Sequence, residues 1–536
     1  MFPTLDRLDE TLAGRTSLRL RLVCPSQEFS PAEMAHGVGR WYSGVRGLWE
    51  IYGLVAQPDL VVVMLQAPAL PPEVLDHLLG LPRPAPATPD DARRLPAPAT
   101  PDDAASRLAM VEPGDARRRL AMVELDDESA RHLSEKFLAR PAVLARLRQT
   151  VRRAREHGHR VEGLAGFASS RRMARLADTL GVPLLETPPE TLRWGGKAAG
   201  RRLFRDVGVP HLPGGYRPVR RVDGLVEELR RLTARHGPGP WLLKVDAGFG
   251  SGHGNAMLTV GRPDPARLRA ALSDGLRPAS AAVSAEEFRR HVEVVGAVVE
   301  RLAVAPAGAT LRFPSASLEM TTGDDQPVVA RIIGTHDQVI DADHSFVGAT
   351  QPAAGAYREA LVRYADTIGR ELARHGVRGH VGIDFLAIGA GPDPADWQLY
   401  ALEINLRQTG TTAANRTALL LTGARCRAGR LVTPAGDDLC YATTDGLIRK
   451  AYQQITPARL VAALRADPRL RFDPESGHGV VPHLWTTLTR FGKVGATVLG
   501  GSVADCRARL AEFERLLDRL SRERVRARRA PDGNRS

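Results

Sequence analysis

Three polar residues suited to metal binding interrupt two apolar segments near residue 400. Asp384 lies in the apolar run VGIDFLAI, and Glu403 and Asn405 stand two residues apart in QLYALEIN. Side chains two apart on a strand point to the same face. A carboxylate in an apolar run is costly to bury unless it is paired or metal-bound. Two carboxylates and an amide oxygen from neighbouring strands predict a Mg²⁺ site, and the alternative is the solvated face of a hairpin.

A glycine-rich segment, GFGSGHG, spans residues 248–254. Alternating glycines clear one side of the backbone, so that main-chain amides can approach a polyphosphate. The segment lacks the Gly-Lys-Ser/Thr ending of a Walker A motif and the G-x-G-x-x-G spacing of a dinucleotide-binding fold. The alternative is a glycine-rich hairpin tip. The predicted phosphate-binding residues are Gly248, Gly250, Ser251, Gly252 and Gly254.

Lysine is rare in this chain, which has 74 Lys plus Arg residues of which five are lysines. Two of the five precede the glycine-rich segment: Lys244 lies just before it, and Lys197 opens a predicted helix further upstream. A compact ammonium group suits phosphate oxygens. Both lysines are therefore predicted to contact a phosphorylated ligand.

Strand and helix patterns alternate along the chain and predict an α/β framework for these residues. Strands are expected at SLRLRLVC, PDLVVVMLQA, HRVEGLAGF, VPLLETP, VEVVGAVVERLAV, QPVVARIIGTHDQVI, RGHVGIDFLAIG, DWQLYALEIN and WTTLTRFGKVGATVLGG. PWLLKVDAGFGSGHGNAMLTV predicts one strand before its glycine loop and a second strand after it. Helices are expected at PPEVLDHLLG, RPAVLARLRQTVRRAREHG, SSRRMARLADTLG, YREALVRYADTIGRELARHG, from Lys197 to a C-cap at Gly208, and from about 502 to 525.

Composition excludes several classes of protein. The net charge of +13 comes from arginines interleaved with acids, and aromatics make up 5%, so neither a groove-reading motif nor a stacking platform for nucleic acid is indicated. Four scattered cysteines without a Cys-x-x-Cys pair encode neither a zinc knuckle nor a disulfide scaffold. The first residues carry acids and no apolar run spans a bilayer. We expect a cytoplasmic protein without nucleic-acid or membrane partners.

Short repeats mark an insertion in the N-terminal part of the chain. PAPATPDDA occurs at 84–92 and 96–104, and RLAMVE occurs at 107–112 and 119–124. Repeats this short cannot bury a core of their own, and they predict a flexible duplicated segment. The predicted division is an N-terminal α/β domain at 1–82 and 126–190, an insertion at 83–125, a core at 191–425, and a C-terminal domain with a basic tail at 426–536.

The order of the motifs resembles that of the ATP-grasp superfamily of carboxylate-amine ligases. These motifs are Lys197, Lys244 with GFGSGHG, VVERL, GIDFL and LEINLRQTGTT, and the resemblance covers about 191–425. Three longer segments are most similar to peptide ligases of the pheganomycin type and their actinobacterial relatives. They are WGGKAAGRRLFRDVGVPHLPGG, GTHDQV and GVVPHLWTTLTRFGKVGATVLG. The resemblance implies an α+β ATP-grasp fold, with an N-terminal α/β pre-ATP-grasp domain, a two-lobed core and a small C-terminal α+β domain.

The same resemblance implies ATP and Mg²⁺ as cofactors and gives roles to single residues. Lys197 and Lys244 would contact the α- and β-phosphates, and residues 248–254 would close over the β- and γ-phosphates. Glu300, in VVERL, would lie at the adenine end. Arg407 would stabilise an acyl phosphate. The Mg²⁺ ligands would be Asp384, Glu403 and Asn405.

The chain departs from the family pattern at three places. The residue two before Asp384, often arginine in the superfamily, is Gly382, RLAVAPAGAT lacks a second acid, and NLRQTGTT replaces the common Asn-x-x-Pro-Gly ending. Arg331 is a further catalytic candidate that would bind a carboxylate, or else faces solvent. His336 and Asp337 would orient substrate, or else form a polar turn after a strand.

Thr411 and Thr412 follow the motif EINLRQ and have two readings. They would contact the carboxylate substrate, or else cap the following helix.

The implied activity is ATP-dependent formation of an amide or peptide bond between a small-molecule acid and an amine or peptide, in peptide natural-product biosynthesis. An acyl phosphate would be the intermediate, and a homodimer would be usual. The alternatives are a non-catalytic nucleotide-binding ATP-grasp scaffold or sensor, and an arginine-driven nucleic-acid binder.

Overall fold

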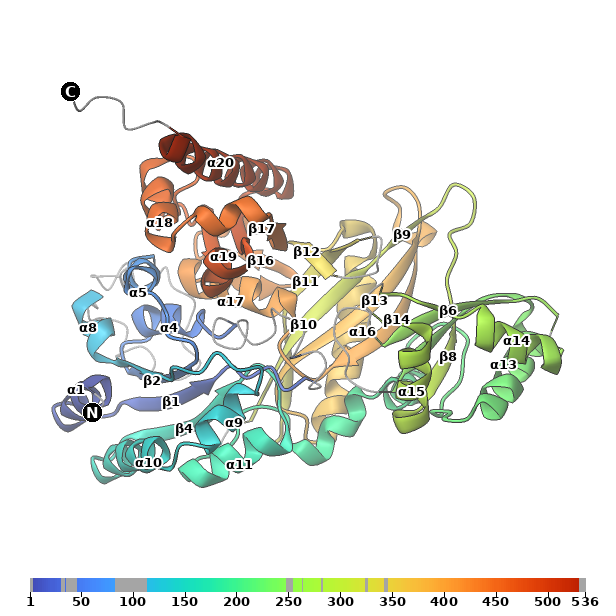
Figure 1. The fold of residues 1–536 in the computed structure, drawn as a ribbon, viewed down its shortest axis with the longest axis horizontal. Helices are drawn as coiled ribbons and strands as arrows, with labels where there is room; N and C mark the ends of the chain where they lie inside the picture. Colours follow the sequence, from blue (N-terminus) through green and yellow to red (C-terminus); the bar gives the residue numbers. More distant parts are fainter. Residues whose placement is uncertain are drawn as a thin grey trace. The chain divides into compact units, whose positions relative to one another are not determined.

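The structure is a computed structural model that describes residues 3–29, 34, 46–81, 113–246, 254–262, 264–280, 283–322, 326–341 and 346–529. The chain divides into two units, and Figure 1 shows their helices and strands. Unit 1 comprises Met1–Pro189, Gly348–Pro352 and Gly410–Ser536. Unit 2 comprises Glu190–Val347 and Ala353–Thr409. The fold is mixed α/β, as the sequence predicts.

A parallel sheet forms the N-terminal part of unit 1, with the strand order β3-β2-β1-β4. Its strands are β1 (Arg19–Cys24), β2 (Leu60–Gln66), β3 (Leu120–Glu124) and β4 (Arg160–Gly166). Strand β2 is buried along its whole length, which is usual for a parallel strand covered on both faces. The flanking helices are α1 (Pro3–Ala13), α4 (Glu50–Ala56), α5 (Pro72–Leu79), α9 (Leu133–Leu138), α10 (Pro141–Glu156) and α11 (Arg171–Leu180).

The segment VPLLETP forms no strand of its own, contrary to prediction. Within it, Leu184 makes one isolated parallel bridge, to Leu164 of β4.

Helix α8 (Pro113–Arg118) and strand β3 lie within the range predicted as an insertion. The second RLAMVE copy forms β3, which pairs with β2. Its Leu120 and Val123 are buried, so this copy is part of the core. Arg119 opens the copy and is fully buried, where it donates hydrogen bonds to Asp115 and to the carbonyls of residues 54, 57 and 60. The remaining residues of the predicted insertion, 83–112, lie outside the described residues.

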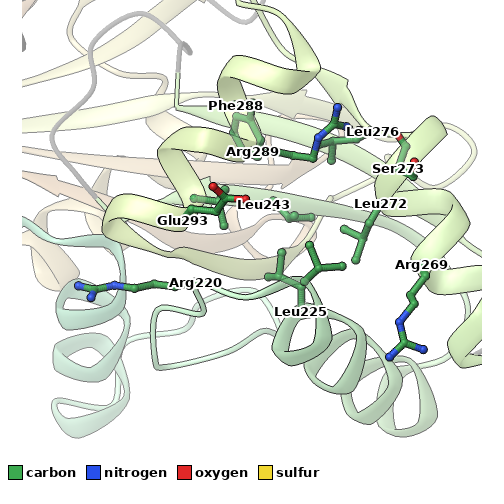
Figure 2. A pocket seen from close by; sticks show the side chains of 12 residues that line it. Arg220, Leu225, Leu243, Arg269, Leu272, Ser273, Leu276, Phe288, Arg289 and Glu293 are labelled. Carbon is green, nitrogen blue, oxygen red and sulfur yellow. Dashed lines mark hydrogen bonds between the residues drawn. The ribbon is translucent and has the colours of Figure 1, made fainter.

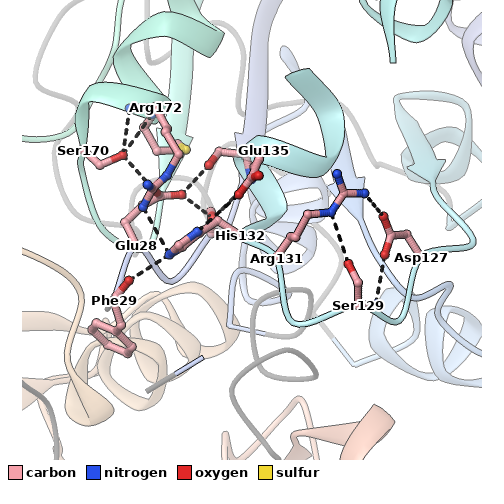
Figure 3. A network of polar contacts seen from close by, with 12 residues as sticks. Glu28, Phe29, Asp127, Ser129, Arg131, His132, Glu135, Ser170 and Arg172 are labelled. Carbon is pink, nitrogen blue, oxygen red and sulfur yellow. Dashed lines mark hydrogen bonds and ion pairs between the residues drawn. The ribbon is translucent and has the colours of Figure 1, made fainter. Parts of the chain in front are cut away.

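A buried carboxylate organises the carboxyl ends of β1 and β4. Glu28 accepts hydrogen bonds from the hydroxyls of Ser26, Ser134 and Ser170 at 2.5, 2.5 and 2.7 Å. Arg172 Nε donates to the same carboxylate at 3.0 Å, as Figure 3 shows. Burial alone would raise the pKa of Glu28, but the hydroxyl donors outweigh it and lower the pKa. An ionised carboxylate therefore ties the segment after β1 to α9 and α11.

An antiparallel sheet forms the C-terminal part of unit 1, where residues 348–351 of β12 (Phe346–Gln351) pair with β17 (Asp438–Ile448). The other strands are β15 (Arg425–Arg427), β16 (Arg430–Val432), β18 (Gly479–His483) and β19 (Lys493–Gly500). The helices are α17 (Gly410–Thr422), α18 (Pro457–Ala466), α19 (Trp485–Phe491) and α20 (Val503–Arg529). One apolar core joins this sheet to a face of the parallel sheet.

The segment WTTLTRFGKVGATVLGG is not a single strand, contrary to prediction. Its first half forms α19, which ends at Gly492 with a φ of 65°. A left-handed residue at this position is a common helix stop, and glycine adopts it without strain. Only Lys493–Gly500 is extended.

Unit 2 contains two separate apolar cores. In the first lobe, helices pack on an antiparallel sheet with the order β7-β6-β5-β8. Its strands are β5 (Gly239–Val245), β6 (Asn255–Val260), β7 (Arg277–Pro278) and β8 (Ala297–Arg301), and its helices are α13 (Val222–His236), α14 (Pro265–Asp274) and α15 (Ala285–Val295). Residues 292–295 of the predicted strand VEVVGAVVERLAV are the end of α15, and Gly296 with a φ of 92° separates them from β8.

The second lobe is an antiparallel sheet with the order β14-β13-β10-β11, and β9 (Thr310–Arg312) also pairs with β13. Its other strands are β10 (Pro314–Thr321), β11 (Val329–Ile340), β13 (Gly379–Gly389) and β14 (Gln398–Asn405). Helices α12 (Lys197–Asp206) and α16 (Gly355–Arg374) contribute to its core. The strands that carry Asp384 and Glu403 are therefore neighbours, as predicted.

The first lobe holds a cavity of about 260 Å³, shown in Figure 2. Leu225, Leu243, Leu272 and Phe288 supply much of its apolar lining. Successive side chains of a strand point to opposite faces, so Leu243 and Lys244 lie on opposite faces of β5. The cavity therefore belongs to the helix-covered face of this sheet, away from Lys244.

No helix in the described ranges is both long enough and apolar enough to cross a membrane.

Replacing Arg119 with methionine should destabilise unit 1 by about 3 kcal/mol, because Asp115 and three carbonyls would lose a buried donor. Urea unfolding followed by tryptophan fluorescence measures the change. Arg118→Met is the matched control, since Arg118 is 62% exposed and lies 3.6 Å from the same carboxylate. Equal unfolding midpoints for the two variants would show that Arg119 does not hold β3 in place.

Candidate active site

The amino terminus of α12 is fixed by a carboxylate from the end of β5. Asp246 Oδ1 accepts a hydrogen bond from the backbone N–H of Ala198 at 3.0 Å. A Cβ added to Gly196, the N-cap residue, would lie 3.2 Å from the same oxygen, so glycine lets the carboxylate approach. Lys197 is thereby held at the first position of the helix. The sequence marked Lys197 and Lys244 but gave no signal for Asp246, two residues after Lys244.

Lys244 belongs to a buried group of three charges with Glu300 and Arg201. The register pairs Leu242 with Glu300 across β5 and β8, so Lys244 and Glu300 are diagonal neighbours on one face. Glu300 Oε1 accepts from Lys244 Nζ at 3.1 Å, and Glu300 Oε2 accepts from Arg201. Both the Glu300 and Arg201 side chains are 2% exposed. Two cations share one carboxylate, so this group carries a net charge of +1.

Arg201 also anchors the group to the backbone. Its Nε donates to the carbonyl of Gly215 at 2.8 Å, and its second terminal nitrogen donates to the carbonyl of Leu212 at 2.7 Å. Sequence reasoning did not single out Arg201, because one arginine among so many carries no compositional signal.

The three predicted metal ligands lie together on the second lobe. Asp384 and Glu403 are direct partners in the register of β13 and β14, beside a β-bulge between Asp384 and Phe385. Asn405 Nδ2 donates to Asp384 Oδ2 at 2.8 Å and lies 3.4 Å from Glu403 Oε1. Lys197 Nζ donates to Glu403 Oε2 at 2.5 Å. Lys244 Nζ lies 3.5 Å from the carbonyl of Leu402, so both lysines reach β14.

The two carboxylates titrate in opposite directions. Burial and the neighbouring Glu403 carboxylate raise the pKa of Asp384. Burial would also raise the pKa of Glu403, but Lys197 and Lys244 outweigh it and lower the pKa. As the pH rises, Glu403, beside the lysines, therefore loses its proton before Asp384 does.

The side chains of Asp384, Glu403 and Asn405 fit a hard divalent cation if the amide of Asn405 is rotated by half a turn. No group of three or more His, Cys, Asp or Glu side chains in the described part of the chain is placed to hold a metal, so the candidate set is two carboxylates and an amide. Asn405 points its nitrogen at Asp384, while its Oδ1 accepts from Arg407 at 3.1 Å. With the amide turned over, Asp384, Glu403 and Asn405 would present three hard oxygens, the donors that Mg²⁺ prefers.

A row of polar residues continues from Glu403 across the sheet. The register places His336 beside Ser315, and Ser315 beside Asp384. His336 is fully buried, and burial lowers its pKa to about 3. Gln338 Nε2 donates to Asp384 Oδ1 at 2.8 Å, a contact that the sequence did not predict. The alternative reading of a polar turn at His336 and Asp337 is wrong, because both lie inside β11.

Asp337 lies on the other face of β11 from Gln338, because successive side chains of a strand alternate. Asp337 accepts hydrogen bonds from the hydroxyl of Tyr357 at 2.6 Å and from the N–H of Ala354, at the start of α16, at 2.9 Å. Arg331 is exposed and opposite Glu319. Asp337 therefore lies on the face opposite Asp384. A register shift of β10 and β11 places Arg331, partner of Glu319, on the same sheet face as Ser315 and Asp384. The roles of Asp337 and Arg331 toward a substrate stay predictions.

Gly382 is required by close packing next to Asn405. The two residues are register partners, and a Cβ on Gly382 would lie 2.5 Å from Cγ2 of Thr409. A larger side chain at position 382 would collide with Thr409, which explains the departure from the arginine of the family pattern.

Thr411 and Thr412 lie in unit 1 and are buried in the first turn of α17. The helix begins at Gly410, so neither threonine is its N-cap residue. The substrate contact predicted for them stays a prediction.

Most of the glycine-rich segment lies outside the described residues, and this includes Gly248, Gly250, Ser251 and Gly252. Gly254 is described and buried, and its carbonyl accepts from the N–H of Val245 at 2.8 Å. The predicted role of this segment in phosphate binding stays a prediction.

Comparison with known proteins gives one relative of similar length. The chain is 29% identical over 402 residues to L-propargylglycine–L-glutamate ligase of Streptantibioticus cattleyicolor, covering 72% of this chain and 76% of the relative. No protein-family model matches the chain.

Solved structures show weaker likeness. An N5-carboxyaminoimidazole ribonucleotide synthetase solved with ADP is 10% identical with a TM-score of 0.49, over 94% of this chain and 98% of the other. The biotin carboxylase domain of a Hydrogenobacter thermophilus 2-oxoglutarate carboxylase is 13% identical with a TM-score of 0.49, over 93% and 90%. Both scores lie below 0.5, so these likenesses carry no weight for the site.

Replacing Asp384 with asparagine should stabilise the protein at pH 8, by on the order of 1 kcal/mol, because it removes a charge that is buried and repelled by Glu403. The native-state pKa of Asp384 is raised, so the penalty is absent below the unfolded-state pKa and grows as the pH rises toward the native one. Thermal unfolding at pH 5 and pH 8 measures the gain. Asp393→Asn, at an exposed position, is the control. A gain that is equal at both pH values would contradict the assignment.

Proposed function

We propose that this chain, an ATP-dependent carboxylate-amine ligase of the ATP-grasp type, joins the carboxylate of an amino acid or small acid to the amine of an amino acid or peptide. One observation carries the proposal. Lys197 and Lys244, from different elements of unit 2, converge on β14, where Glu403 stands beside Asp384 of the neighbouring strand β13. The named activity of the 29% identical relative, which joins two amino acids, supports the same reaction class.

We assign nucleotide binding to the two lysines. Each ammonium group is paired with a carboxylate in the structure, Lys197 with Glu403 and Lys244 with Glu300. A phosphate oxygen is an equivalent partner for an ammonium group. On binding ATP, the lysines would exchange part of these contacts for α- and β-phosphate oxygens, and the 248–254 segment would cover the β- and γ-phosphates.

Mg²⁺ would be held by Asp384, Glu403 and Asn405, and when bound it would neutralise charge on the phosphates. Gln338 keeps Asp384 in place through its hydrogen bond to Oδ1. Lys197 holds the Glu403 side chain from the other side. These contacts orient the oxygens before any cation arrives.

The reaction follows from the placement of charge. An oxygen of the substrate carboxylate attacks the γ-phosphorus, the bond to the β,γ-bridging oxygen breaks, and ADP leaves. The amine then attacks the carbonyl carbon of the acyl phosphate, phosphate leaves, and the amine gives up a proton. Such chemistry asks for positioning and for cations near developing negative charge. Arg407, beside Asn405, is assigned to the acyl phosphate.

The acid and the amine are both proposed to be amino acids or short peptides, and the setting to be the biosynthesis of a peptide natural product. The relative supports this class, because its name gives L-propargylglycine and L-glutamate. A homodimer stays a prediction from the family resemblance.

Glu403→Gln should lower amine-dependent ADP release by at least about a hundredfold at saturating Mg²⁺, because the change removes the charge that pairs with Lys197 and would bind the cation. Coupled-enzyme detection of ADP, with amino-acid pairs selected by mass spectrometry, measures it. Glu227→Gln, at a side chain 64% exposed in the same unit, is the matched control. Full activity of Glu403→Gln would disprove the metal assignment. Nucleotide binding without ADP release for any pair would instead favour the scaffold.

Arg201→Met should weaken ATP binding by about tenfold, because the net charge of the Arg201–Glu300–Lys244 group falls from +1 to zero. The double variant Arg201→Met/Glu300→Gln restores the charge of +1 and should recover most of the affinity in calorimetry. Failure of the double variant to recover affinity, with an unchanged melting temperature, would point to a direct contact between Glu300 and adenine.

A further inference from the structure

The cavity in the first lobe of unit 2 is an apolar space that the side chains of the lobe leave unfilled. Its volume is about 260 Å³, and Leu225, Leu243 and Leu272 point toward its centre from α13, β5 and α14 (Figure 2). Phe288 of α15 lines it and is fully buried. Protein interiors hold few voids larger than a water molecule, because an unfilled apolar space costs stability. A void of this size is therefore better explained by an occupant than by packing alone.

The cavity is open to solvent at its edge. Val222, the first residue of α13, lines the cavity and is 43% exposed. Ser273, near the end of α14, also lines it and is exposed. Leu225, Leu243 and Leu272, in contrast, are each at most 4% exposed. A small molecule can therefore enter from solvent and reach an apolar interior without unfolding of the lobe.

Three arginines stand around the apolar centre, as Figure 2 shows. Arg269 is satisfied, because its terminal nitrogen donates to Asp223 Oδ1 at 2.7 Å. Arg289 donates from one terminal nitrogen to the carbonyl of Ser273 at 3.0 Å. Arg220 makes no hydrogen bond or ion pair with the part of the chain that the structure describes. Arg220 and Arg289 thus keep donors available at the edge of the cavity.

The charge at this edge favours an anion. Glu293 is the one acidic side chain among the described residues that line the cavity. Counting also Asp223, the partner of Arg269, three positive charges stand against two negative ones, which leaves a surplus of +1. An arginine can lay its methylene stem on apolar surface while its guanidinium stays in water. A carboxylate at the edge would find such a guanidinium as a charged donor.

We propose that this cavity binds a medium-chain carboxylic acid, with the hydrocarbon chain among the leucines and the carboxylate at the edge beside Arg220 and Arg289. An engineered apolar cavity of about 150 Å³ binds benzene, so a cavity of 260 Å³ has room for a longer chain such as that of octanoate. Leu243 and Lys244 lie on opposite faces of β5. The acid would therefore bind on the other face of the sheet from the proposed nucleotide site. This site goes beyond the proposed function and does not depend on it.

The test is calorimetry on the full chain with octanoate, 1-octanol and octylamine, which share the same chain and differ in charge. We expect octanoate to bind at one saturable site, at least about tenfold more tightly than the other two. The double variant Arg220→Met/Arg289→Met should weaken octanoate binding by about tenfold and leave octanol binding unchanged. Arg290→Met is the matched control, because Arg290 is an exposed neighbour on α15 that does not line the cavity.

A cavity-filling variant locates the bound acid. Leu272→Phe would place a larger ring in the empty space, so it should abolish octanoate binding without lowering the melting temperature. Saturating MgADP should not displace octanoate, because the nucleotide is assigned to the other face of the sheet.

Absence of saturable octanoate binding to the folded chain would overturn the proposal. Equal or tighter binding of octanol or octylamine, or full octanoate affinity in the double arginine variant, would overturn the assignment to an acid. Octanoate binding that persists in folded Leu272→Phe, or that MgADP displaces, would place the acid outside the cavity. If Leu272→Phe does not fold, the double arginine variant decides. Octanoate binding without ADP release for any amino-acid pair would leave this site standing while the ligase proposal falls.

Discussion

The pairing of two lysines with carboxylates is the interaction on which the candidate active site of unit 2 depends. Lys197 at the start of α12 contacts Glu403 on β14, and Lys244 on β5 contacts Glu300 on β8. Each ammonium group is almost fully buried, and a buried charge without a partner is costly. The carboxylates supply these partners at positions where an anionic ligand could take over the contact. Asp246 fixes the start of the helix that carries Lys197, and Arg201 holds Glu300, the partner of Lys244.

The same requirement explains why Asp384 and Glu403 tolerate each other. Two neighbouring carboxylates repel, and burial makes the repulsion worse. Lys197 and Lys244 favour the ionised form of Glu403, while Asp384 has a raised pKa and is held by the amides of Gln338 and Asn405. A bound divalent cation would relieve the remaining strain. Under the proposed function, the site would give up stability in the free protein for affinity toward a cation, a balance that active sites commonly show.

Much of this site could be predicted from the sequence, because its signals are local. An acid inside an apolar strand, two polar residues at a spacing of two, and rare lysines in an arginine background each stand out in a single segment. Residues that matter through distant contacts gave no such signal. Arg201 is one arginine among many, Gln338 reaches Asp384 across two strand pairings, and Asp246 caps a helix that begins 49 residues earlier. His336 and Asp337, adjacent in sequence, were grouped together although strand alternation sends their side chains to opposite faces.

A structure of the full chain determined with MgADP tests the central claim most directly. The account predicts that Lys197 Nζ and Lys244 Nζ lie within hydrogen-bond distance of phosphate oxygens, and that Asp384 and Glu403 ligate the cation, with Asn405 turned to present its oxygen. A nucleotide bound elsewhere in the chain, or bound in unit 2 with both lysines contacting only their carboxylates, would contradict it.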